Sequence, residues 1–136
     1  MRKERYNQKL NELEDRIEFL ETNLSWKEEF LNNRILRKAC YKEFQEAVEI
    51  VSDILAMIVK DSEKPVEDDY SNIEIVDRIV GLKETKDVLK RSHGLRNVLV
   101  HEYNGIDDVM AFESMNECIK GMKKFVKKVK EWLKKT

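Results

Sequence analysis

The stretch "ILRKACYKEFQEAVEIVSDILAMI", residues 35–58, decides the fold class of this chain. Its apolar residues recur mostly at spacings of three and four, which is the period of one face of an α-helix. They are Ile35, Cys40, Phe44, Ala47, Val48, Val51, Ile54, Leu55 and Ile58. Because this stripe is wide enough to contact more than one neighbouring helix, we predict that the stretch is the central helix of an all-α protein.

The flanking sequence repeats this helical period on both sides of the central stretch. Short polar connections separate the periodic segments, which is typical of helices that pack antiparallel to their sequence neighbours. The apolar stripes cover residues 6–24, 75–82, 88–99 and 115–133. We therefore expect an antiparallel helical bundle of four to five helices.

Capping residues predict where these helices begin. A serine followed three residues later by a glutamate can form a reciprocal capping box, and a threonine or an aspartate can cap a helix alone. The predicted starts are Ser25 with Glu28, Ser71 with Glu74, Thr85, and Asp107. A long helix that includes the central stretch is expected to follow Ser25 and to end in the polar run around Pro65.

Length and composition agree with this class. The 136 residues suit one domain, expected over residues 1–136, with a sizeable core. Charged residues make up 39% and hydrophobic residues 41%, while four glycines and one proline are too few for the turns of an all-β fold. The net charge of −1 does not by itself indicate a nucleic-acid-binding protein.

The charges are nevertheless unevenly distributed along the chain. Acidic residues gather between positions 61 and 77, whereas "KGMKKFVKKVKEWLKKT", residues 120–136, is rich in lysine. Such runs are usually solvated helix faces. The lysines can alternatively form a cationic rim that meets RNA phosphates, and the sequence leaves both interpretations open.

Cysteine usage and the N-terminus bear on the cellular compartment. Cys40 and Cys118 occupy apolar positions of the helical period, where a free thiol behaves as a small hydrophobic group. Their spacing indicates neither a disulfide framework nor a zinc site, and they suit a reducing cytoplasm. The segment "MRKERYNQKLNELE", residues 1–14, is charged throughout, and no stretch is as long as a membrane span. We expect a cytoplasmic protein without a membrane segment.

The stretch "GLRNVLVHEYNG", residues 94–105, contains the most varied polar side chains, Arg96, Asn97, His101 and Tyr103. Cations and asparagine are common at helix C-termini, so a helix end alone can explain them. Asn97 and His101 are four positions apart and can touch, whereas Arg96 and His101 lie about 140° apart around an ideal helix. Either the last turn deforms to bring Arg96 and His101 together, or they approach one ligand from different sides.

The segment "RNVLVHEY", residues 96–103, resembles the R-x4-H-x-Y signature of HepT-type HEPN domains, the toxin half of HEPN/MNT toxin–antitoxin modules. A long second helix, an acidic loop and a long final helix around it resemble the same family. The resemblance implies a metal-independent endoribonuclease with catalytic Arg96 and His101 and supporting Asn97, in a site formed where two protomers of a homodimer meet. It also implies that a partner minimal nucleotidyltransferase, the antitoxin, neutralises the toxin by adenylylating Tyr103.

The residue types of this motif suit RNA cleavage. A histidine, whose unperturbed pKa is about 6.5, can take a proton from a ribose 2′-hydroxyl or return one to the leaving 5′-oxygen near neutral pH. The charged, fork-shaped guanidinium of Arg96 suits phosphate oxygens, and no residues nearby require a metal ion or another cofactor. One motif histidine per chain is too few for both proton transfers, which favours a homodimer that brings two copies of His101 to one cleft.

Other interpretations of the motif region stay open. His93 lies three residues before Arg96 on the same helix face but outside the motif, and we expect it to be an exposed helix histidine. The chain can instead be a non-catalytic HEPN module that binds nucleotide or RNA as the substrate-binding partner of a nucleotidyltransferase. A plain scaffold bundle is a third possibility, in which Arg96 and His101 serve no activity.

Overall fold

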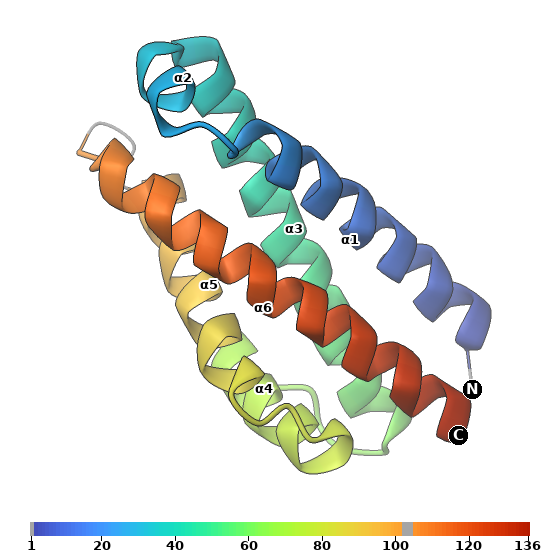
Figure 1. Ribbon diagram of the computed structural model, residues 1–136. Helices are drawn as coiled ribbons and strands as arrows, with labels where there is room; N and C mark the ends of the chain where they lie inside the picture. The colour runs from blue at the N-terminus through green and yellow to red at the C-terminus, as the bar shows by residue number, and fades with distance from the viewer. Residues whose placement is uncertain (1, 102–104) are drawn as a thin grey trace.

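The computed structural model describes residues 2–101 and 105–136, and these residues form six α-helices and no β-strand. The helices are α1 (Lys3–Asn23), α2 (Lys27–Asn32), α3 (Arg34–Asp61), α4 (Asp69–Val80), α5 (Thr85–His101) and α6 (Asp108–Lys135). The four longest, α1, α3, α5 and α6, run alternately up and down, and the two chain ends lie at the same end of the molecule (Figure 1). The predicted all-α antiparallel bundle is confirmed, with six helices in the described residues where four to five were expected.

The two shorter helices lie at opposite ends of this bundle (Figure 1). At one end α2 contacts α3 and α6, and at the other α4 packs against α3 and α5. The end that carries α2 also carries the beginning of α3, the end of α5 and the beginning of α6 (Figure 1). Segments far apart in the sequence therefore meet at the α2 end, where the motif of α5 is located.

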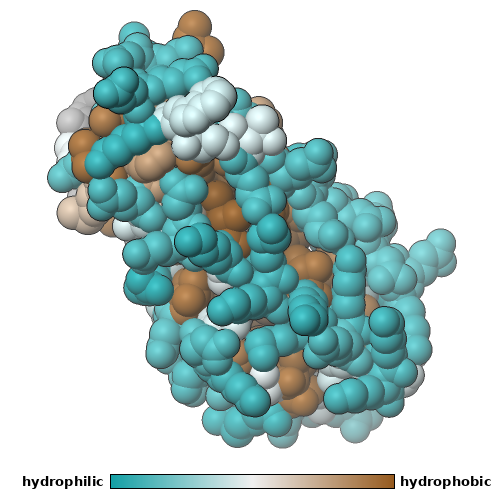
Figure 2. Space-filling view, in the orientation of Figure 1, coloured by the Kyte–Doolittle hydropathy of each residue, from teal (hydrophilic) through white to brown (hydrophobic). Residues whose placement is uncertain are grey.

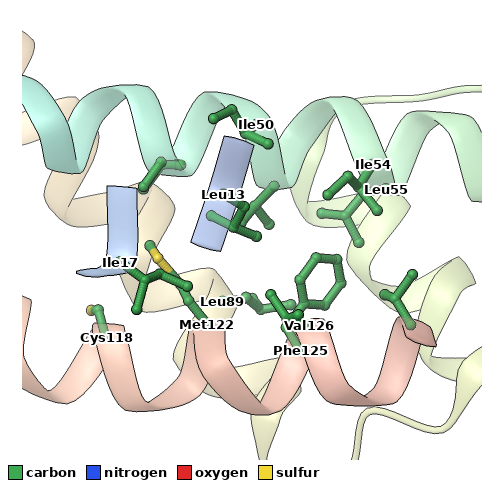
Figure 3. Packing of buried hydrophobic residues seen from close by; sticks show 14 of the residues in the cluster. Leu13, Ile17, Ile50, Ile54, Leu55, Leu89, Cys118, Met122, Phe125 and Val126 are labelled. Atoms are coloured by element: carbon green, nitrogen blue, oxygen red, sulfur yellow. The ribbon is translucent and has the colours of Figure 1, made fainter. Parts of the chain in front are cut away.

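The core lies between the long helices, as the periodic stripes predict. Figure 3 shows apolar side chains of α1, α3, α5 and α6 meeting there. Phe44 of α3 and Phe125 of α6 are fully buried, and Cys40 and Cys118 are buried as small hydrophobic groups. Ile35 is an exception in the central stripe, because its side chain is 82% exposed at the start of α3.

Two of the predicted helix caps, Ser25 and Ser71, are wrong. Asn33 and Asp68 instead accept the hydrogen bonds of the free backbone amides at the starts of α3 and α4. Ser25 Oγ donates to the carbonyls of Glu21 and Thr22, so Ser25 closes α1 instead of opening the next helix. Asn33 then caps α3, accepting from the Leu36 amide at 3.0 Å. The single long helix expected after Ser25 is consequently divided into α2 and α3.

The starts of α4, α5 and α6 follow different caps. Asp68 caps α4 by accepting from the Ser71 amide at 2.8 Å, so Ser71 is not the cap. Thr85 is the first residue of α5 and is buried, and its hydroxyl makes no hydrogen bond within the described residues. The predicted cap at Asp107 is confirmed, since it accepts from the Met110 amide at 3.1 Å.

Gly81 ends α4 with a left-handed φ of 78°, which favours glycine.

Gly121 permits the close approach of α5 and α6. A Cβ atom at this position would lie 2.2 Å from Cγ1 of Val88, which is too close for two non-bonded carbon atoms. We expect Gly121→Ala to lower the free energy of unfolding by about 1–3 kcal/mol through overpacking, measured by urea denaturation.

Gly94→Ala is the matched control within the same helix pair. The nearest atom to its added methyl group would be the Tyr70 hydroxyl at 3.8 Å, an ordinary contact. This replacement should therefore stabilise α5 by about 0.5–1 kcal/mol, because alanine suits a helix interior better than glycine. Equal stability of the two variants would contradict the close approach at Gly121.

Hydrophilic residues cover most of the molecular face in Figure 2, and hydrophobic residues show along the seams between helices. More hydrophobic surface is visible at the end where α2 and the start of α6 lie (Figure 2). Among the described residues, no helix combines the length and the hydropathy needed to cross a membrane.

Candidate active site

Residues 96–101 of the motif form the last turns of α5, which is α-helical through His101. The final turn therefore does not deform, and Arg96 and His101 remain about 140° apart around the helix axis. Leu99 between them is buried in the core, whereas Asn97 and His101 are exposed. In the part of the chain that the structure describes, no hydrogen bond joins His101 to Arg96 or Asn97.

Two contacts orient the side chain of Arg96. Its Nε donates to Asn97 Oδ1 at 3.2 Å, and its Nη2 lies 3.7 Å from Asp69 Oδ2 at the start of α4. The side chain is 23% exposed, so part of the guanidinium is accessible to a ligand. A guanidinium carries five N–H donors in a fixed fork, and several of these remain available to a phosphate group. The structure thus places Asn97 against Arg96 and not against His101.

His93 is buried, so the prediction of an exposed histidine is wrong. Only 1% of its surface is accessible, because α3 and α4 cover this part of α5. Its Nδ1 lies 2.9 Å from the Leu89 carbonyl, which can only accept, so Nδ1 carries the proton. Nε2 then accepts from the Ser52 hydroxyl of α3 at 2.7 Å. The carboxylate of Asp69 lies 3.7 Å from the same nitrogen.

Burial lowers the pKa of His93 below its ordinary value of 6.5, although the Leu89 carbonyl and Asp69 act in the opposite direction. The folded protein therefore binds a proton at His93 less readily than the unfolded chain does. We expect the stability associated with neutral His93 to be complete above pH 6.5 and to decrease as the pH falls below it.

Urea denaturation between pH 7.5 and pH 5 measures this loss. The control is His93→Gln, which keeps an amide capable of hydrogen bonding and cannot take up the proton. The variant should lose less stability than the wild-type protein over the same pH range. Identical pH dependence in both proteins would exclude His93 as the titrating group.

Asp69 is a site neighbour that the sequence did not indicate. It belongs to the acidic run of residues 61–77, and its carboxylate lies between His93 and Arg96. The contact joins α4 to α5 across 27 positions of the chain, so no local spacing could have revealed it. Elsewhere in this run, Asp68 caps α4 and Glu74 pairs with Lys86 and Lys90, so these acidic residues serve the fold.

Three lysines of α6 face acidic partners on neighbouring elements. Lys123 lies 2.8 Å from Glu21, and Lys130 lies 2.9 Å from Glu14, both on α1. Lys124 approaches Glu84 at 4.0 Å. These pairs favour the interpretation of a solvated helix face over that of a cationic rim for this part of the lysine-rich segment.

The remaining motif residue, Tyr103, lies outside the described residues, which resume at Gly105. The proposed modification of Tyr103 therefore depends on the sequence alone. Among the described residues, no group of three or more histidine, cysteine, aspartate or glutamate side chains is arranged to hold a metal ion.

Comparison with known proteins identifies the family to which this bundle and its motif belong. A family described as "Ribonuclease HepT-like" matches residues 9–129. This chain belongs to the HepT-like ribonuclease family. The match spans nearly all of the helical bundle, and it includes Arg96, Asn97, His101 and Tyr103.

Curated relatives agree with this assignment to the HepT-like ribonucleases. Two proteins of Archaeoglobus fulgidus, both named "Putative RNase", are similar to the chain. One is 35% identical over 136 residues, covering 99% of this chain and 98% of the relative. The other is 38% identical over 108 residues, covering 79% and 77%. No solved structure matches the chain significantly. The family and these names support a ribonuclease function of the HEPN type.

Proposed function

We propose that this chain is the toxin of a toxin–antitoxin pair, a metal-independent endoribonuclease whose active site forms between two copies of the chain. The observation that carries the proposal is the geometry of α5. Its undeformed last turn leaves His101 exposed, while Arg96 is held toward α4 on another side of the helix. A symmetric dimer can bring both residue types of both protomers to one cleft.

Exposed apolar side chains near the motif support a second copy as the partner. Val98 and Val100 of α5 and Val109 and Met110 of α6 are between 38% and 62% exposed. They lie at the end of α5 and the beginning of α6, the two helices between which Tyr103 falls in the sequence. Apolar surface of this kind is often a site of protein association.

The proposed reaction needs one base and one acid. The His101 of one protomer takes the proton of a ribose 2′-hydroxyl, whose oxygen forms a bond to the adjacent phosphorus. The bond between phosphorus and the 5′-oxygen breaks, and the partner's His101 donates a proton to that oxygen. Arg96 binds the phosphate oxygens as negative charge accumulates on them. The products are a 2′,3′-cyclic phosphate and a free 5′-hydroxyl.

Incubation of the purified protein with total cellular RNA tests the proposed function. Cleavage is expected in the presence of EDTA, with 5′-hydroxyl ends on the products. RNA that stays intact would contradict the proposal. Binding of RNA or nucleotide without cleavage would favour the alternative, a non-catalytic HEPN module that serves a nucleotidyltransferase.

Adenylylation of Tyr103 by a minimal nucleotidyltransferase is the proposed control of this activity. An AMP group two residues from His101 would place a bulky, negatively charged phosphodiester where the RNA phosphate binds, and would occupy Arg96. We expect the wild-type protein, but not Tyr103→Phe, to gain the mass of AMP when incubated with the partner enzyme and ATP. RNA cleavage by the modified protein should be lost, and cleavage by Tyr103→Phe should persist. Modification of both proteins would place the acceptor elsewhere.

A further inference from the structure

A groove lined by basic side chains lies beside the motif. Its volume is about 480 Å³, and the first turns of α3 form one wall. Four cationic residues of α3 line it, Arg34, Arg37, Lys38 and Lys42, together with Leu99 of α5 and Asp108 of α6. Leu99 lies between Arg96 and His101 in the sequence of α5, so the groove and the motif share one end of the bundle.

Asp108 is the acidic residue among these lining residues, and Arg37 compensates its charge. Asp108 Oδ2 lies 3.5 Å from Arg37 Nε, and its Oδ1 accepts a hydrogen bond from the Tyr41 hydroxyl. Burial and the nearby Asp108 raise the pKa of Tyr41 well above its ordinary value, so this hydroxyl stays protonated. The charge of Asp108 is therefore compensated by Arg37 and cannot neutralise the other cations of the groove.

Arg34, Lys38 and Lys42 are exposed, and none of them forms an ion pair with a described residue. They are spaced four residues apart, so they lie on one face of α3 over a length of about 12 Å. Three lysines of α6 differ in this respect, since Lys123, Lys124 and Lys130 each lie within 4.0 Å of a glutamate. Arg34, Lys38 and Lys42 therefore bring three positive charges to the groove that no described carboxylate pairs with.

Arg34 lies at a position of α3 that is unfavourable for a cation. Arg34 is its first residue, and the first turn contains no acidic side chain. The free N–H groups make the N-terminus of a helix electropositive, so a cation in the first turn is unfavourable for folding. The helix end adds to the positive potential of the side chains, which indicates an anionic ligand.

We propose that this groove binds the phosphate backbone of single-stranded RNA next to the cleavage site, an inference that rests on the ribonuclease function proposed above. A cationic groove that follows the backbone is the usual means of holding a single strand. Proteins that bind double-stranded RNA by shape contact about 16 base pairs over two minor grooves, much more than this groove can span. The single strand is therefore the favoured ligand.

Binding of a fluorescent single-stranded RNA oligonucleotide, at several salt concentrations, tests the inference. The cleavage-deficient His101→Ala protein serves as the background, so that the RNA stays intact. In this background, Arg34→Gln, Lys38→Gln and Lys42→Gln are combined. The matched control combines Lys123→Gln, Lys124→Gln and Lys130→Gln, which removes the same charge from α6. Thermal melting verifies that both variants fold.

The groove variant is expected to bind at least about tenfold more weakly. The slope of log K against log salt concentration, which is negative, should become shallower by about 2. The α6 control should change affinity less than about threefold, because its lysines are already paired. Equal losses in both variants, or undiminished binding by the groove variant, would overturn the inference. So would tighter groove-dependent binding of a duplex of the same sequence.

The two proposals fail in different ways. Groove-dependent binding by a wild-type protein that never cleaves RNA would refute the ribonuclease function and leave the groove as an RNA-binding site. Cleavage that depends on His101, with binding that does not depend on Arg34, Lys38 or Lys42, would refute the groove alone.

Discussion

RNA cleavage is expected to fall about 10²- to 10⁴-fold when His101 is replaced by alanine. In the proposed dimer this change removes both the base that activates the 2′-hydroxyl and the acid that protonates the 5′-oxygen. His101 is exposed, so the variant should fold normally and lose less than about 0.5 kcal/mol of stability. Single-turnover cleavage of a labelled RNA measures the chemical step directly.

The control for this variant is Arg91→Ala on the same helix. Arg91 is exposed and pairs with Glu117 of α6 at 2.9 Å, away from the motif. We expect this replacement to leave the cleavage rate unchanged. A His101→Ala protein that cleaves RNA as fast as Arg91→Ala would assign the activity to another residue or to a contaminant.

Replacement of Arg96 by alanine has the second largest expected effect, a loss of about 10²- to 10³-fold in the cleavage rate. The guanidinium is held by Asn97 and by Asp69, and its free donors suit the phosphate oxygens of the transition state. Lysine cannot reproduce the planar fork, so Arg96→Lys should recover little of the rate.

Comparison of Arg96→Ala with Arg91→Ala separates a catalytic role of Arg96 from the effect of losing one positive charge. Both variants remove one positive charge from α5, five positions apart. If Arg96 acts on the transition state, its loss should appear in the rate at saturating RNA and not only in RNA affinity. If both variants weakened RNA binding equally and left the rate at saturating RNA unchanged, that role would be contradicted.

The helical framework could be predicted from the sequence because burial follows a regular period. Phe44 and Phe125 are buried where the stripes of residues 35–58 and 115–133 place them. The helix starts were harder to predict because several polar residues compete for the same backbone groups. Asn33 and Asp68 cap α3 and α4, although Ser25 and Ser71 show the stronger capping pattern.

The environment of the motif could be predicted only in part. Its residues could be recognised from their spacing, but their partners come from other helices. His93 is buried because Ser52 and Asp69 meet it across the bundle. The groove was also missed, because Arg34, Lys38 and Lys42 look like ordinary helix charges until their lack of described acidic partners is known.

The two-protomer active site is tested most directly by mixing wild-type protein with His101→Ala subunits. If one cleft needs the His101 of both protomers, mixed dimers are inactive. With a tenfold excess of variant subunits and full subunit exchange, wild-type cleavage should therefore fall to about a tenth of its starting value. A sample assayed before exchange, with RNA in excess, controls for competition between the proteins. Activity that stays unchanged after exchange, with mixed dimers verified by native mass spectrometry, would contradict a shared site.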